Sequence, residues 1–448
     1  MLDQTLDKIS RIRNASELKL PVLFFGFAVW VSFPIIGIFP LLLSVQLDLL
    51  RPSKKSSQLL SLNNLILVLV VLTLATYISA FDVFADTKKY LDIYIALDRQ
   101  APWDNYIADD RFEVVLFFFF AVVHYLSNES IFWCLFSFAL FNNALITFYV
   151  SKKLSPRYYP TLLIILFSTF FYYSQIFYMR QFLALAFVMA AIASMESSWI
   201  LFWLFSLLAI FSHTSSIMFV LVCLVAQSVD LIANQLKRKK WETRDKVIIY
   251  LLIGLLFGAF IYGAIQMYNE PKIIYRLINN VLEYLPQGQV ISSVQGRIEN
   301  NDSRDTEIFE VTIFLIIAIF SLGCFIVRRN YEKISPKILS LILIFFVSML
   351  QILFILVTGF NQRIAYLFLA FYGLFFCIGL DDLKINQVNK VKSFGFVSAL
   401  TVFVAAANTV KFIDIQVKMV DIVGISFFDK QPLSMSLFDY IVYFFKSM

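Results

Sequence analysis

Residues 176–187 read IFYMRQFLALAF and place an arginine and a glutamine in an otherwise apolar run. Such a run has the composition of a membrane helix, where a charged side chain is costly and usually marks a binding or catalytic site. The function of these two residues therefore depends on how much of the chain lies in the membrane and on where its charges lie relative to the apolar runs.

The composition is that of a membrane protein. The 448-residue chain is 60% hydrophobic and 17% aromatic, and only 15% of its residues are charged. A soluble protein of this size could not bury that much apolar surface, so we predict a polytopic membrane protein. The apolar runs lack the alternation of a transmembrane barrel, which predicts an all-α fold. The four cysteines lie inside these runs without CxxC spacing, so we expect neither disulfides nor a metal site.

Apolar runs of about 18–25 residues, each long enough to cross a ~30 Å hydrocarbon core, recur along the chain. They predict about 12 transmembrane helices in a single integral membrane domain over residues 1–448. The predicted spans are 20–48, 59–81, 131–150, 160–176, 178–195, 199–211, 213–234, 247–268, 308–327, 337–358, 363–380 and 393–411. Pro34 and Pro40 could kink the first of these or split it into a hairpin.

Lysine and arginine cluster in five short loops, which the positive-inside rule assigns to the cytoplasm. These loops are residues 51–55, 151–157, 237–246, 328–333 and 381–392. An even number of predicted spans separates neighbouring loops, so the assignment is self-consistent. It makes 82–130 and 269–307 external loops and the C-terminal tail 412–448 external as well. The net charge of +6 then reflects membrane topology, and we expect no nucleic-acid partner.

Two segments do not fit a simple series of spans. The residues before the first span are basic, which argues for a cytoplasmic N-terminus, and a hairpin at 20–50 would reconcile this with the five basic loops. Residues 111–126 are apolar but short and flanked by charge. We predict a re-entrant or interfacial helix there.

Charged and polar residues near the membrane converge on the predicted external face. They include Asp86 and Glu113 in the first external loop, Arg180 and Gln181 at the outer end of a span, His213 at an outer junction, Arg297 in the second external loop, and Arg363 at the outer end of a late span. Several arginines facing one vestibule suit a phosphate-bearing ligand. A neighbouring carboxylate could act as a general base on a hydroxyl, and aromatic residues such as Tyr90 suit sugar faces.

Five short motifs follow one another along the chain, and they are DTKKY (86–90), FEVVLF (112–117), MRQFLALA (179–186), FSHTS (211–215) and NQRIAY (361–366). Their order resembles that of the EpsG family of polysaccharide polymerases. The resemblance covers roughly residues 60–380, and the chain departs from the family pattern where Val-Val follows Glu113.

The resemblance implies a Wzy-type polymerase of exopolysaccharide, capsule or O-antigen in the bacterial cytoplasmic (inner) membrane, with its active site facing outward. It implies a GT-C-like bundle with interfacial helices in the first large external loop. The substrates would be lipid-linked oligosaccharides on undecaprenyl diphosphate. The protein would need no cofactor or metal, and its partners would be membrane lipids, a flippase and a chain-length regulator. The catalytic residues would be Asp86, Glu113 and His213, and the substrate-binding residues Tyr90, Arg180, Gln181, Arg297, Arg363 and Tyr366.

Other functions remain open on the sequence alone. A lipid-linked oligosaccharide flippase would also suit about twelve spans, although its charges should follow a path through mid-membrane. An O-antigen ligase-type glycosyltransferase would share the arginines, the histidine and the external loops. Arg180 and Arg363 could also serve as headgroup anchors at span ends, and His213 could join two helices through hydrogen bonds.

Overall fold

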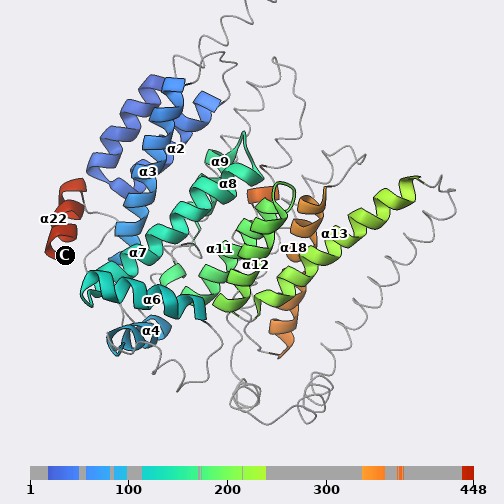
Figure 1. Ribbon diagram of the computed structural model, residues 1–448. Helices are drawn as coiled ribbons and strands as arrows, with labels where there is room; N and C mark the ends of the chain where they lie inside the picture. Colours follow the sequence, from blue (N-terminus) through green and yellow to red (C-terminus); the bar gives the residue numbers. More distant parts are fainter. Residues whose placement is uncertain are drawn as a thin grey trace, which may run out of the picture. The chain divides into compact units, whose positions relative to one another are not determined.

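The computed structural model describes residues 19–49, 57–80, 85–97, 114–169, 172, 174–213, 215–238, 335–358, 371, 373–375, 377 and 436–447. The secondary structure of these residues is helical and contains no strand, which confirms the all-helical prediction (Figure 1). The chain divides into two compact units, and each is described by itself. The first comprises residues 1–217, 321–330 and 370–448, and the second comprises 218–320 and 331–369.

Two helices of the described residues are long and apolar enough to cross a membrane, and both belong to the first unit. One lies in α3 (Ser57–Ser79), and the other is the continuous helix Ile131–Leu154, built from α7 (Ile131–Ala144), the π-helical η1 (Leu145–Val150) and α8 (Ser151–Leu154). They run antiparallel, since Lys152 near the end of the second donates from Nζ to Asn64 Oδ1 near the start of the first, at 3.0 Å.

Residues 19–49 form a helical hairpin, so the single predicted span 20–48 is replaced by two shorter helices, Lys19–Ser32 and α2 (Pro34–Leu49). Pro34 opens the second helix, the position that tolerates its missing N–H. Gly37 packs directly against the Trp30 backbone. At the open end, Lys19 Nζ lies 2.8 Å from Asp48 Oδ1. Lys19 therefore lies at the same end of the hairpin as the residues that lead into the basic loop 51–55. This position agrees with the prediction that both the N-terminal segment and that loop are cytoplasmic.

The predicted span 160–176 is also interrupted. The helix α9 (Tyr159–Phe167) has nine residues, about 14 Å, and ends at Phe167. The chain then reaches α11 (Met179–Ser194) through turns that include the 3-10 turn η2 (Ser174–Ile176). Because α9 ends this early, the chain after it turns within the bundle, and α11 begins there.

The helices α11 and α12 (Trp199–Ser212) form an antiparallel hairpin around the turn at residues 195–198. Alanines 184, 186, 190, 191 and 193 are buried on α11, and Phe202, Ser206 and Ala209 make a buried stripe on α12. Small side chains let the two backbones approach closely. The hairpin brings the start of α11 and the end of α12 to one end of the unit.

Two helices from the predicted external loop 82–130 lie at that same end. Figure 1 shows α6 (Val114–Ser127) crossing the start of α7, with α4 (Ala85–Ile95) beside it. The Tyr94 hydroxyl joins them through Ser127 Oγ at 2.9 Å, and the Tyr94 ring packs edge-on against Phe120. The helices predicted in this loop are therefore present, and we call this the α4 end. The opposite end carries Lys152, Lys153 and the 195–198 turn, joined by the Lys153 Nζ donation to Ser197 Oγ at 2.8 Å.

Large apolar side chains face outward from the helices of the first unit. Phe24 is 71% exposed, Leu126 76% and Ile200 80%. Water would penalise such a surface, whereas hydrocarbon would not, so the helices suit a membrane protein.

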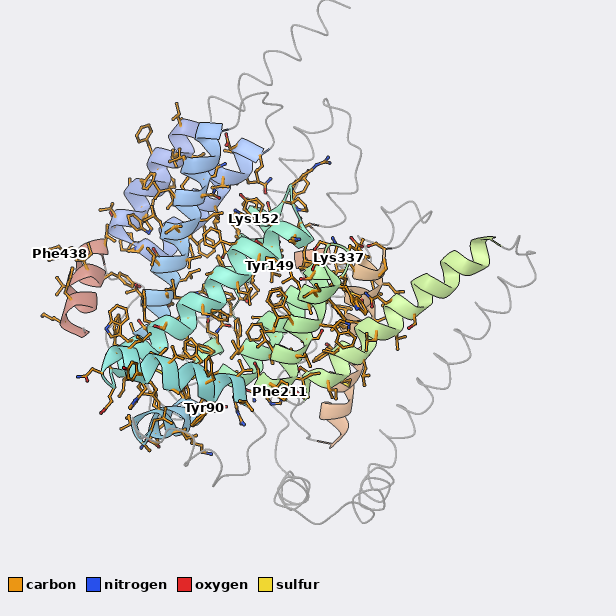
Figure 2. All side chains as sticks on the ribbon, in the orientation of Figure 1. Tyr90, Tyr149, Lys152, Phe211, Lys337 and Phe438 are labelled. Carbon is orange, nitrogen blue, oxygen red and sulfur yellow. The ribbon has the colours of Figure 1, made fainter. Side chains whose placement is uncertain are left out.

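The other described helices are α13 (Ser216–Arg238), α18 (Pro336–Thr358) and α22 (Leu437–Ser447). In the second unit, α18 matches the predicted span 337–358. In the first, α22 lies in the predicted tail 412–448, packs against α3 and leaves Phe438 exposed (Figure 2). The predicted spans 247–268, 308–327 and 393–411, and most of 363–380, lie outside the described residues.

The hairpin of residues 19–49 gives a direct test of the fold. Gly37→Ala would push a Cβ into the Trp30 backbone, so we expect an apparent melting temperature several degrees lower, in keeping with the ~1–3 kcal/mol cost of overpacking. The measurement is thermal unfolding of the purified protein in detergent. Ile36→Ala is the matched control, because the neighbouring Ile36 is 50% exposed. Equal melting curves for the two variants would contradict the close approach at Gly37.

Candidate functional site

Arg180 is the second residue of α11, at the α4 end of the first unit. The N-cap, Tyr178, makes no side-chain capping hydrogen bond to the start of α11, and a cation at this position opposes the helix dipole. Arg180 therefore does not stabilise the start of its helix electrostatically. It instead suits an anion, which would be attracted by the side chain and by the helix terminus together.

Tyr90 on α4 orients the Arg180 side chain. The Nε–H of Arg180 donates to the Tyr90 hydroxyl oxygen at 3.0 Å, and the guanidinium carbon lies 5.4 Å from the ring centroid. Tyr90 is only 4% exposed, so the contact is shielded from water. A hydrogen bond from a charged donor contributes ~2 kcal/mol in such a setting. Figure 2 labels Tyr90 at this end of the unit, together with Phe211 near the end of α12.

The helix α4 is itself tied to the turns before α11. The Thr87 hydroxyl donates to the Ile176 carbonyl at 2.8 Å, and Thr87 is fully buried. Asp86 precedes Thr87 and stands four residues before Tyr90, so positions 86 and 90 share one face of α4. The D-x-x-x-Y spacing thus places positions 86 and 90 on the face of α4 that contacts Arg180.

A buried polar network holds the turns between α9 and α11. The Tyr172 hydroxyl donates to Asn143 Oδ1, and Gln175 Nε2 donates to the same oxygen at 3.4 Å and to the Tyr172 carbonyl at 3.2 Å. Asn143 lies midway along the Ile131–Leu154 helix, and all three side chains are buried. Irregular backbone inside an apolar bundle requires such internal partners. The network fixes where α11 begins and therefore where Arg180 lies.

His213 follows the last residue of α12, outside the helix, and belongs to the same end as Arg180. Its Nδ1 lies 2.7 Å from Ser215 Oγ and accepts from the Ser215 backbone N–H at 3.2 Å. Burial, followed by the positive charge of Arg180, lowers the pKa of His213 to about 4. The imidazole is therefore neutral at physiological pH, and its proximity to Arg180 is electrostatically significant.

Comparison with known proteins identifies the family of this chain. A family model described as the EpsG family matches residues 64–417, which is most of the chain. The chain belongs to the EpsG family. Membership indicates a polysaccharide polymerase-type function for a membrane protein. No curated protein and no solved structure matches the chain.

The EpsG match contains every residue of the predicted site, and the structure reaches only part of that set. It brings Tyr90, Arg180 and His213 together from α4, α11 and the end of α12. Gln181 is 7% exposed, and its amide oxygen has no hydrogen-bond partner among the described residues. Asp86 lies on α4, but its side chain is outside what the structure describes. Residues outside the described ranges are Glu113, Arg297, Arg363 and Tyr366.

The residues that position this candidate site are not among those predicted from the sequence. Thr87 and Ser215 adjoin predicted site residues, yet their hydrogen bonds depend on contacts that no spacing shows. Asn143 and Gln175 did carry a signal, because an amide side chain within an apolar span is unusual and needs a partner. The pairing itself could not be read from the sequence, since 32 residues separate the two.

The depressed pKa of His213 predicts a stability change below neutral pH. In the unfolded chain the imidazole takes up its proton near pH 6.5, whereas in the folded chain it does so only near pH 4. Stability should therefore fall as the pH drops from about 6.5 towards 4, because the unfolded state binds the extra proton first. Thermal unfolding of His213→Gln should show a weaker dependence over this window. Identical pH dependence in the variant and the wild type would contradict a buried neutral His213.

Proposed function

We propose that this EpsG-family protein joins oligosaccharide repeat units linked to undecaprenyl diphosphate, by glycosyl transfer at the outer face of the bacterial cytoplasmic membrane. The observation that carries the proposal is the Arg180 guanidinium, set at the start of α11, oriented by Tyr90 and accompanied by a neutral His213. Preorganised donors of this kind stabilise the negative charge that develops on a departing diphosphate.

In the proposed reaction, an acceptor hydroxyl attacks the anomeric carbon of the growing chain. The new glycosidic C–O bond forms, the C–O bond to the carrier diphosphate breaks, and the diphosphate leaves as an anion. Arg180 stabilises that anion, while Asp86 or Glu113 takes the hydroxyl proton as the general base. Tyr90, Gln181, Arg297, Arg363 and Tyr366 would hold the substrates, and no nucleotide sugar is consumed.

The proposed arrangement is a GT-C-like bundle of about twelve spans with α4 and α6 as interfacial helices. The α4 end would face outward, because Lys152 and Lys153 at the opposite end belong to a basic loop and such loops stay in the cytoplasm. Residues 82–130 and 269–307 would then be external. A flippase supplying substrate and a chain-length regulator are the expected partners.

Reconstitution tests the polymerase directly. Purified protein given only the lipid-linked repeat unit should make a ladder of polymers. Arg180→Lys keeps the charge but loses the geometry of the guanidinium, so we expect polymerisation to fall by ~10²-fold, the usual cost of an oxyanion donor. Arg157→Lys, an exposed arginine in the basic loop 151–157, is the control and should retain wild-type activity. Repeat units that cross a vesicle membrane but are recovered unextended would overturn the polymerase in favour of a flippase.

Orientation can be tested by cysteine labelling in a background whose four native cysteines are replaced by alanine. Lys89 is exposed on α4 and Glu196 is exposed in the 195–198 turn, at opposite ends of the first unit. A membrane-impermeant maleimide should label Lys89→Cys in intact spheroplasts, and should label Glu196→Cys only after permeabilisation. The reverse pattern would place Arg180 on the cytoplasmic side and contradict polymerisation outside the cell.

A further inference from the structure

Two neighbouring serines after α12, Ser215 and Ser216, make different hydrogen bonds to His213. Ser216 caps the junction, because its hydroxyl donates to the His213 carbonyl at 2.7 Å and its backbone N–H donates to the same carbonyl at 3.0 Å. Ser215 contacts the imidazole ring instead, through both its hydroxyl and its backbone N–H. The joining of α12 to α13 therefore does not explain why Ser215 reaches the ring.

The contacts of Ser215 determine which ring nitrogen carries the proton. A backbone N–H can only donate, so Nδ1, which it approaches at 3.2 Å, must be an acceptor. With Nδ1 unprotonated, the Ser215 hydroxyl at 2.7 Å must also donate to it. The proton of a neutral imidazole then lies on Nε2. Among the described residues, Nε2 has no hydrogen-bond partner, so this N–H is available to a ligand.

We infer that Ser215 is a positioning residue that holds His213 as the Nε2–H tautomer, so that the imidazole offers a hydrogen-bond donor beside Arg180 and does not act as a base. The ligand chemistry that fits is an oxyanion, whose oxygens only accept. Identifying that oxyanion as the diphosphate of the lipid carrier rests on the proposed function, whereas the tautomer does not.

The charges around the ring favour this assignment over an imidazolium. Arg180 on α11 is the charged group of the described residues that acts on His213, and Arg180 in turn donates to the Tyr90 hydroxyl on α4. A second cation next to a partly shielded arginine would be repelled, so the neutral ring with one fixed donor is the stable form. The proton acceptor of the reaction must then be another group, which leaves that role to the predicted carboxylates Asp86 and Glu113.

The tautomer can be read without any assay of activity, because the chain has only two histidines. We would label histidine with ¹⁵N in the purified full chain in nanodiscs and assign the signals with His124→Gln. At pH 7, His213 should show a protonated Nε2 and an unprotonated Nδ1. Ser215→Ala removes the hydroxyl donor at 2.7 Å and leaves only the longer backbone N–H contact at 3.2 Å, so part of the population should shift to Nδ1–H, and Ser215→Thr should restore the wild-type spectrum. Ser216→Ala is the control that removes a hydrogen bond at the same junction but should leave the tautomer unchanged.

A wild-type spectrum with Nδ1 protonated, or with both nitrogens protonated at pH 7, would overturn the inference. A Ser215→Ala spectrum identical to the wild type would overturn the positioning role of the Ser215 hydroxyl. Activity on the lipid-linked repeat unit gives a second test. His213→Gln keeps an N–H donor and should polymerise at least ~10-fold faster than His213→Glu, which offers only an acceptor. The opposite order would show that His213 is a base. Failure of the wild type to polymerise would refute the proposed function while the spectrum still decides the tautomer.

Discussion

The break between α9 and α11 is the feature on which the described site depends. A helix that ends inside an apolar bundle releases backbone groups that water cannot reach, so the protein has to supply their partners. Gln175 contributes by donating to the Tyr172 carbonyl, and Asn143, in the middle of the Ile131–Leu154 helix, holds the Gln175 and Tyr172 side chains by accepting from both. Thr87 contributes from α4 by donating to the Ile176 carbonyl. The start of α11 is fixed by these contacts, and Arg180 is carried to its position with it.

At this position, the helix terminus and the Arg180 side chain both produce a positive electrostatic potential. A helix N-terminus favours anions, and Arg180 adds a full positive charge at that terminus. Tyr90 holds the guanidinium through Nε, and the burial of Tyr90 keeps water from competing for the contact. His213 is kept neutral by burial and by Arg180, so the two side chains can lie near each other without repulsion. The result is an oriented cation at a helix N-terminus next to a neutral imidazole, the arrangement that we propose binds an oxyanion.

The packing of α11 against α12 makes the site compatible with a lipid environment. The alanines of α11 and the stripe Phe202, Ser206 and Ala209 of α12 let the helices pack closely, while Ile200 and Leu204 face outward from α12. Small side chains thus line the contact between α11 and α12, while large apolar side chains occupy both the core and the outer surface of the unit. A soluble protein would not expose so many large apolar side chains, because water rather than hydrocarbon surrounds it.

The sequence by itself determined the class of protein and the position of most described helices. Apolar run length is a local property, so α3, α7, α11, α12 and α18 were predicted close to their observed bounds. The motif order also sufficed to recognise the EpsG family, which the family match confirms.

Only the tertiary structure decided where those runs break and which polar residues meet. In the hairpin of residues 19–49, Gly37 fits against Trp30, and after the early end of α9 the side chains of Tyr172 and Gln175 bind Asn143. Composition could not show either, because an apolar run has the same hydropathy whether it is straight, folded back or interrupted. Tyr90 and Arg180 are 90 residues apart in the sequence. They likewise make contact only because α4 packs at the end of the bundle where α11 begins.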